Sequence, residues 1–145
     1  MKRMESTLYI VATPIGNLGD ITLRAIDILK SVSLILCEDT RVTRKLLSHY
    51  QIHTPVLSYH EHSGPDKVAG IIEKLKSGGD MALVTDAGTP AISDPGSLLL
   101  KAVSEFPGIK ISPIPGPSAL IAALSISGFP ADSFVFMGFV PHKNG

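Results

Sequence analysis

Residues 85–96 have the composition best suited to contact a ligand, because they combine two glycines, two prolines and two aspartates. The apolar run that precedes them, at 81–84, is typical of a buried strand. A loop that turns this sharply leaves backbone amide and carbonyl groups outside regular structure, where a bound molecule can reach them. We therefore expect ligand contacts from residues 86–93, whereas Asp94 and Pro95 are typical of a helix N-cap and its first turn.

A second polar group follows the strand-like run at 32–37 and consists of Glu38, Asp39, Thr40 and Arg41. Two interpretations stay open. In the first, Asp39 or Thr40 caps a helix and the Arg41 side chain is solvated. In the second, Arg41 meets a phosphate while Asp39 or Glu38 orients a hydroxyl group.

Two catalytic patterns are incomplete in this sequence. His60 and His62 flank Glu61, so an extended backbone would place both imidazoles on one side, as a metal pair requires. Without a third ligand in register, a polar wall of a substrate pocket is favoured and no metal is expected. Ser118 follows Gly-Pro as in half of a nucleophile elbow, but the closing glycine is missing. We expect Ser118 to cap a helix, with a serine hydrolase as an alternative.

The elements that position these groups alternate between strands and helices. Apolar runs predict strands at 8–12, 32–37, 55–58, 81–84 and 109–114. Helical spacing predicts helices at 21–29, 42–50, 65–76, 95–106 and 120–126. This alternation predicts an α/β fold with a mostly parallel five-stranded sheet and helices on both faces. In such a sheet the ligand lies outside the carboxyl ends of the strands, and all five unusual loops fall there.

Composition limits the classes of partner. The chain has 145 residues, 44% of them hydrophobic, which suits one domain with a real core. Thirteen basic and thirteen acidic residues cancel, so any contact with nucleic acid must be local, and Arg44 and Lys45 beside Arg41 form the basic cluster at this edge. The single cysteine, Cys37, indicates a reducing compartment, and we expect a cytoplasmic protein without a membrane span.

The pattern changes near residue 128. After Gly128, Phe129 and Pro130, residues 134–140 form a sixth strand-like run that ends in apolar and aromatic side chains. We expect this run to open a second domain, since it would otherwise leave apolar surface uncovered. The predicted organisation is an α/β domain at 1–127, followed by a linker and the first strand of a further, truncated domain at 128–145.

Four motifs in order make the chain resemble the tetrapyrrole methylase superfamily. They are Thr-Pro-Ile-Gly-Asn-Leu-Gly-Asp at 13–20, Glu-Asp-Thr-Arg at 38–41, Asp-Ala-Gly-Thr-Pro at 86–90 continued by Asp-Pro-Gly at 94–96, and Pro-Gly-Pro-Ser-Ala at 115–119. Within it they resemble the branch that 2′-O-methylates a cytidine of 16S ribosomal RNA. The resemblance implies S-adenosylmethionine as methyl donor in a cleft between two α/β domains. It also implies a homodimer that acts on 16S rRNA, with the small ribosomal subunit as the expected partner.

The resemblance also assigns site residues by position. Cofactor contacts are expected from Pro14, Ile15, Gly16, Asp86, Ala87, Gly88, Thr89, Ile92, Ser118 and Ala119, in loops whose small residues permit close approach. Candidates for a base that removes the hydroxyl proton are Asp39, which we prefer slightly, Glu38 and His60. Arg41, Arg44 and His62 are expected to contact the substrate. The alternatives are a superfamily methylase that acts on a tetrapyrrole or a protein side chain, and a non-catalytic fragment that only binds cofactor or dimerises.

Overall fold

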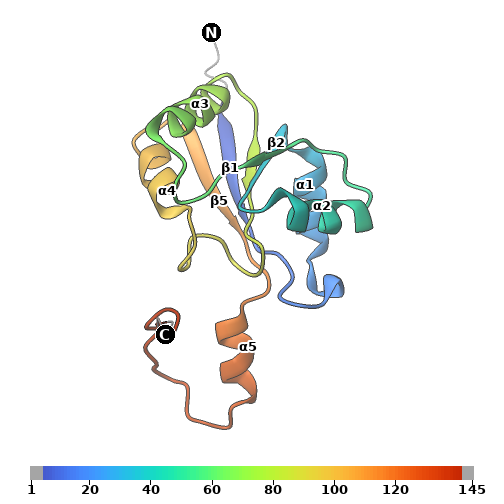
Figure 1. Cartoon of the computed structure of the whole chain (residues 1–145), viewed down its shortest axis with the longest axis vertical. Coiled ribbons are helices and arrows are strands. Elements are labelled where there is room, and N and C mark those ends of the chain that lie inside the picture. Colours follow the sequence, from blue (N-terminus) through green and yellow to red (C-terminus); the bar gives the residue numbers. More distant parts are fainter. Residues whose placement is uncertain (1–4, 142–145) are drawn as a thin grey trace.

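The computed structural model describes residues 5–141, and its central feature is a five-stranded parallel sheet (Figure 1). The strands lie in the order β3-β2-β4-β1-β5 and every neighbouring pair is parallel. In chain order they are β1 (Ser6–Val11), β2 (Leu34–Cys37), β3 (Val56–Ser58), β4 (Met81–Leu83) and β5 (Ile109–Ile114). The predicted sheet is confirmed. Because β4 and β1 are neighbours at its centre, the loops that follow them lie side by side.

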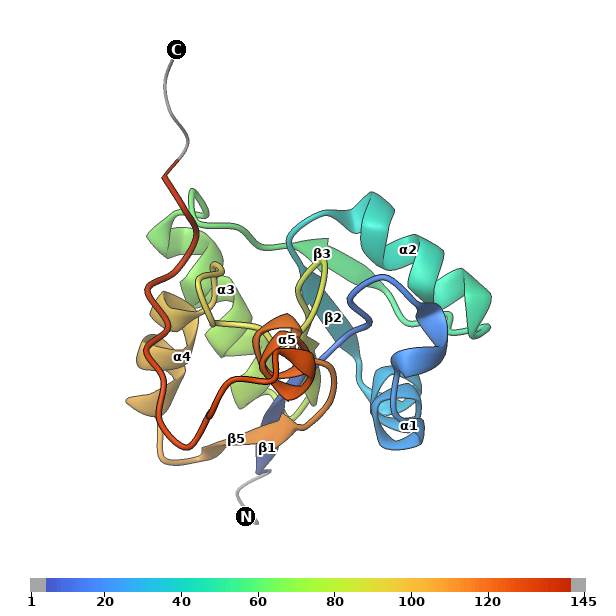
Figure 2. The same ribbon diagram turned by 90° about the horizontal axis from the view of Figure 1, so that it is seen from below.

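Helices connect the strands and cover both faces of the sheet. They are α1 (Leu23–Ser31), α2 (Thr40–His49), α3 (Pro65–Lys76), α4 (Ser97–Ser104) and α5 (Ala119–Ile126), with a 3₁₀ turn, η1 (Leu18–Asp20), before α1. The first two helices pack on one face, and α3 and α4 pack on the other (Figure 2). This is the doubly covered arrangement that the alternation of elements predicts.

The core consists of two apolar clusters, one on each face of the sheet. Ile35 belongs to the cluster under α1 and α2, and its neighbour Leu36 belongs to the cluster under α3 and α4. Successive residues of a strand point to opposite faces, so a strand covered on both sides must be apolar throughout. The wholly buried strand β4 meets this requirement and anchors the loop at 85–96.

Side-chain caps set the starts of three helices. Thr22 Oγ1 accepts a hydrogen bond from the Ala25 amide at 3.0 Å and caps α1. Asp39 Oδ1 accepts from the Arg41 amide at 2.8 Å and caps α2. Ser118 caps α5 at the end of β5, as expected. Each cap satisfies an amide group that the first helical turn leaves unpaired.

The predicted cap role of Asp94 is wrong, because α4 begins at Ser97 with Gly96 as its N-cap residue. Ala91 and Ser93 have positive φ angles of 65° and 57°, so the loop turns further before a helix can start. The Asp94 carboxylate bonds instead to the side chain of Thr85, and burial raises its pKa. Asp94 therefore belongs to the loop and not to the helix.

Helix α5 lies beyond the carboxyl end of the sheet (Figure 1), and within residues 5–141 none of its side chains is buried. Residues 134–140 form no strand in the described chain, contrary to the prediction. A strand needs a neighbouring strand to pair with, and this segment has none among the described residues. The division at 127 stays a prediction, and residues 142–145 lie outside the described part. Among residues 5–141, no helix has the length and apolar character needed to cross a bilayer.

Candidate functional site

The loops after β1 and β4 are joined by a short antiparallel bridge. The Thr13 amide donates to the Gly88 carbonyl oxygen at 2.9 Å, and the Gly88 amide donates to the Thr13 carbonyl oxygen at 3.0 Å. The buried Thr13 hydroxyl also donates to the Thr85 carbonyl oxygen at 3.0 Å. These bonds join residues more than 70 positions apart in the chain. They fix the two loops as one unit at the edge of the sheet.

The loop after β5 closes against this unit. The Thr89 hydroxyl donates to the Pro117 carbonyl oxygen at 3.3 Å. A Cβ atom at Gly88 would lie 3.5 Å from Ile15 Cγ2 and 3.7 Å from the Pro117 carbonyl oxygen. Ile15, Gly88 and Pro117 therefore meet at one point. We call residues 13–16, 86–92 and 115–119 together the three-loop cradle (Figure 2).

The cradle combines backbone features that are typical of ligand sites. Gly88 has a φ of 85°, which favours glycine, and Gly116 approaches Ala12 so closely that an added Cβ would lie 2.9 Å from the Ala12 Cβ. Ile92 is an apolar side chain that is 54% exposed. Strained backbone at 91 and 93 lies in the same loop, and such strain gathers at ligand sites. Small residues, strain and an exposed apolar side chain are thus combined in one loop.

The loop after β2 reaches the cradle through Asp39, whose amide donates to Asp86 Oδ1 at 3.2 Å. The Asp39 carboxylate binds the Arg41 guanidinium in two hydrogen bonds of 3.1 and 2.8 Å. These bonds and the Arg41 amide lower the pKa of Asp39 to about 2. Arg41 is thus paired with its own helix cap. The cap role of Asp39 is confirmed, whereas contact of Arg41 with a phosphate stays a prediction.

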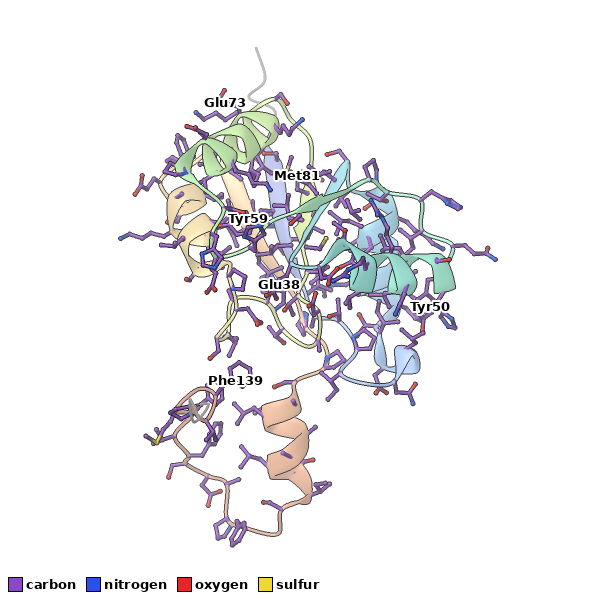
Figure 3. The ribbon with its side chains drawn as sticks, viewed as in Figure 1. Glu38, Tyr50, Tyr59, Glu73, Met81 and Phe139 are labelled. Atoms are coloured by element: carbon purple, nitrogen blue, oxygen red, sulfur yellow. The ribbon has the colours of Figure 1, made fainter. Side chains whose placement is uncertain are left out.

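Glu38 lies at the end of the sheet where the loops gather (Figure 3). Partial burial raises the pKa of its carboxyl group, and the nearby carboxylates of Asp86, Asp94 and Glu61 raise it further. Glu38 is therefore the acidic side chain of this motif that holds a proton more readily than an isolated glutamate.

Replacing Glu38 by glutamine is expected to raise stability at neutral pH. The pKa of Glu38 is higher in the folded protein than its unfolded-state pKa of 4.5. Its contribution to the stability of the fold is therefore fully present below pH 4.5 and is lost as the pH rises through the folded-state pKa. The uncharged amide removes the repulsion, so the melting temperatures of Glu38→Gln and wild type should differ at pH 7 and converge below pH 4.5. Glu105→Gln is the matched control. Equal melting temperatures at pH 7 would contradict the assigned repulsion.

The two histidines adopt different environments. The ring centroids of His60 and His62 are 6.1 Å apart, and His62 Nε2 lies 3.3 Å from a Glu61 carboxylate oxygen. His60 Nδ1 is buried and has no hydrogen-bond partner in the described chain. Across residues 5–141, no group of three or more His, Cys, Asp or Glu side chains is placed to hold a metal ion. A role for the pair in the polar wall of a substrate pocket stays a prediction.

Arg44 is not brought to the cradle. Its side chain lines a hollow of about 570 Å³ with residues 51–56, at the end of α2 that leads into β3. Residues 51–55 precede β3 and Val56 begins it, so this hollow lies at the amino end of β3. The cradle lies at the carboxyl ends of the strands. Arg44 therefore stands apart from the other predicted site residues.

Sequence reasoning missed a pocket of about 240 Å³ between the cradle and α2, which we call the α2 pocket. Its apolar walls are formed by Pro14, Leu18, Val42 and Leu46. The Tyr50 hydroxyl donates to the Leu18 carbonyl oxygen at 2.5 Å and holds η1 against α2. The i, i+4 spacing of Val42 and Leu46 is also that of an ordinary core-facing helix, so the sequence alone gave no signal.

Known proteins with similar sequences match this chain almost from end to end. Ribosomal RNA small subunit methyltransferase I of Xylella fastidiosa is 56% identical over 137 residues, which are 94% of this chain and 50% of that protein. The protein of the same name from Vibrio cholerae is 55% identical over 137 residues, which are 94% of this chain and 47% of that protein. The chain spans about half the length of these curated relatives.

Solved structures share the fold. Uroporphyrin-III-C-methyltransferase from Thermus thermophilus superposes with a TM-score of 0.66 at 22% identity, over 88% of this chain and 55% of that one. A cobalt precorrin-4 methyltransferase gives 0.65 at 22% identity, over 82% of this chain and 49% of that one. The family model described as Tetrapyrrole (Corrin/Porphyrin) Methylases matches residues 7–143. The chain therefore belongs to the tetrapyrrole methylase family.

Proposed function

We propose that this chain is the cofactor-binding part of an S-adenosylmethionine-dependent methyltransferase that 2′-O-methylates a cytidine of 16S ribosomal RNA. The observation that carries the proposal is the three-loop cradle, in which three of the four sequence motifs meet at Ile15, Gly88 and Pro117. The names of relatives at about 50% identity support ribosomal RNA as the substrate. A tetrapyrrole substrate is supported only by similarity of fold to solved structures.

The cradle residues are suited to hold the cofactor. S-adenosylmethionine, when bound, supplies a methyl group that its positive sulfur activates. In the bridge between Thr13 and Gly88, the backbone amide and carbonyl groups of these two residues bond to each other. These groups therefore hold the loops in place and do not bind the cofactor. The neighbouring groups at 14–16, 86, 87, 89, 92 and 118–119 remain for the ligand, and Gly88 itself permits close approach. Because the loops are fixed beforehand, little conformational freedom is lost on binding.

Among the three candidate bases, we favour Glu38 because of its electrostatic environment. A base works best when its pKa lies near the working pH, and the pKa of Glu38 is raised. Asp39, with a pKa of about 2 and both carboxylate oxygens bound to Arg41, is a weak proton acceptor. His60 offers a buried ring nitrogen that is free of protein partners in the described chain. Glu38 thus replaces Asp39 as the first choice for the group that receives the hydroxyl proton.

Partners beyond the chain are part of the same proposal. Exposed apolar side chains gather on α5 and the segment after it, including Ile126, Phe129, Phe136 and Phe139. Figure 3 shows Phe139 well beyond the carboxyl end of the sheet. Patches of this kind mark sites of association, which supports a second folded unit, and a homodimer, packed over the cradle. Arg41 and His62 are proposed to contact the RNA, in a cytoplasmic enzyme that acts on the small ribosomal subunit.

A methyl-transfer assay tests this proposal. The assay uses S-adenosylmethionine with a labelled methyl group and a polypeptide that contains this chain and is as long as its curated relatives. The labelled methyl group is expected on a 2′-oxygen of 16S rRNA in small ribosomal subunits. Glu38→Gln should lower the rate more than Asp39→Asn, with the affinity for S-adenosylhomocysteine unchanged in both. Label on uroporphyrinogen or on protein, with none on rRNA, would establish one of the alternative substrates instead.

A further inference from the structure

The outer side of α2 carries charge of one sign. Arg44, Lys45 and His49 are exposed on this helix, and the exposed His53 follows it before β3. Residues 40–60 include no aspartate or glutamate, although basic and acidic residues cancel over the whole chain. We call Arg44, Lys45, His49 and His53 the basic tract. A local positive surface on a neutral chain directs an anionic partner to one place.

Within the described chain, the two permanent charges of the basic tract have no carboxylate partner. Neither Arg44 nor Lys45 takes part in an ion pair among residues 5–141, whereas their neighbour Arg41 is held by Asp39. Helix α5 and the segment after it lie away from α2 in Figure 1 and in Figure 2. A guanidinium that no carboxylate occupies can bind a phosphate through two parallel hydrogen bonds.

The hollow that Arg44 lines adds neutral polar groups to this charge. Ser48, Gln51 and His53 share its lining, and no described aspartate or glutamate does. Its volume is about 570 Å³, within the ~300–1,000 Å³ of ligand sites. Guanidinium, hydroxyl and amide groups contact the phosphates and sugars of nucleic acids, and such contacts carry no sequence information. The hollow therefore suits a ribose-phosphate unit, whatever its base.

Gln51 occupies a backbone position that glycine would hold with less strain. It has a φ of 54° and directly follows the last turn of α2. There the Ile52 amide donates to the Leu47 carbonyl oxygen at 2.8 Å, and the Gln51 amide donates to the Ser48 carbonyl oxygen at 3.2 Å. Glycine is the usual residue in this helix-ending motif, because left-handed backbone destabilises other L-residues. A strained glutamine whose side chain lines the hollow indicates a role there.

We propose that the basic tract and the hollow bind the ribose-phosphate backbone of ribosomal RNA. Lys45 lines the α2 pocket beside the cradle, and Arg44 lines the hollow, so the tract connects the two. Helix α2 has 10 residues, a length of about 15 Å, so the RNA in the hollow lies outside the site of methyl transfer. Phosphate contacts there orient the RNA while the cradle holds the cofactor. The inference rests on the proposed function, because it assigns a further contact surface for the same substrate.

The test measures binding of a fluorescein-labelled, single-stranded RNA oligonucleotide to the full chain, by fluorescence anisotropy at several salt concentrations. For single strands, each phosphate contact contributes about 0.7 to the slope of the logarithm of the binding constant against the logarithm of salt concentration. Arg44→Glu should therefore lower this slope by about 0.7 or more, and weaken binding about fivefold or more at ~0.1 M salt. Arg44→Lys, which keeps the charge, should retain the slope.

Lys101→Glu is the matched control for the change of charge. Lys101 is exposed on α4, which packs on the opposite face of the sheet from α2. Charges more than ~10 Å apart are largely screened at ~0.1 M salt, so this variant should bind RNA within about twofold of wild type. Arg44→Glu and Lys101→Glu should both keep the melting temperature of wild type and its affinity for S-adenosylhomocysteine.

Substitutions at Gln51 separate RNA binding from folding. Gln51→Gly should raise the melting temperature, because glycine adopts left-handed backbone without strain, and should weaken RNA binding, because the side-chain amide is lost. Gln51→Asn keeps an amide and tolerates the same backbone, so it should bind RNA more tightly than Gln51→Gly. A raised melting temperature with unchanged RNA binding in Gln51→Gly would show a purely structural role and overturn the assignment of the hollow.

Unchanged RNA binding and salt slope in Arg44→Glu would overturn the inference, and so would an equal loss in Lys101→Glu. Binding to vesicles of phosphatidylserine and phosphatidylcholine that Arg44→Glu abolishes, without binding to RNA, would assign the basic tract to a membrane surface instead. In each case, retained binding of S-adenosylhomocysteine by calorimetry leaves the cofactor site of the proposed function standing. RNA binding through the basic tract, with no methyl group transferred to rRNA, would count against the proposed function alone.

Discussion

Replacing Gly88 by valine is expected to lower the affinity of the chain for S-adenosylhomocysteine by about a hundredfold or more, measured by calorimetry. Gly88 has a φ of 85°, and an L-residue with left-handed backbone costs roughly 1–2 kcal/mol, with β-branched residues at the upper end. The new side chain would also press on Ile15 Cγ2 and the Pro117 carbonyl oxygen. Strain and crowding together would separate the three loops, and each 1.4 kcal/mol is about a tenfold loss of binding.

Gly128→Val is the matched control for this effect. Gly128 also has a positive φ, of 74°, but nothing lies within 4 Å of a Cβ placed there. It therefore carries the same backbone strain without touching the cradle, and its affinity for S-adenosylhomocysteine should stay within about twofold of wild type. Equal losses in Gly88→Val and Gly128→Val, or no loss in Gly88→Val, would show that the cradle does not form the cofactor site.

Replacing Leu83 by alanine should lower the free energy of unfolding by about 2–5 kcal/mol, the range for leucine-to-alanine changes in packed cores. Leu83 is 1% exposed and lies in β4, the central strand, between β1 and β2. Its Cδ2 atom would lie 3.2 Å from a Cβ added at Gly96, so it also supports the loop after β4 at the point where α4 begins. Urea denaturation followed by circular dichroism measures the change.

Leu23→Ala makes the same chemical change at a leucine that is 82% exposed, and it should change the free energy of unfolding by no more than about 0.5 kcal/mol. Similar losses for Leu83→Ala and Leu23→Ala would contradict the central position of β4 in the core. A large loss confined to Leu83→Ala would support it.

Local features of the sequence predicted most of the fold. The helix at 65–76 was predicted with its exact limits, because Pro65 suits a first helical turn and the glycines at 78 and 79 end the pattern. The caps at Asp39 and Ser118 followed from residue type alone. The gathering of the chemical groups at one edge followed from parallel strand order, since every unusual loop came after a strand.

The remaining features depend on contacts between distant parts of the chain. Asp94 has the sequence of a cap, but the left-handed backbone at 91 and 93 and the bond to Thr85 decide its role. The α2 pocket exists because η1, α2 and the loop after β4 leave a space that no local pattern encodes. The run at 134–140 has strand composition, yet a strand forms only where a neighbour offers hydrogen bonds.

A crystal structure of the chain with S-adenosylhomocysteine is the most direct measurement of the central claim. Electron density for the nucleoside is expected against Ile15, Gly88 and Ser118, where the loops after β1, β4 and β5 meet. Density for the ligand at any other place, or a well-diffracting soaked crystal with an empty cradle and no binding by calorimetry, would contradict the account.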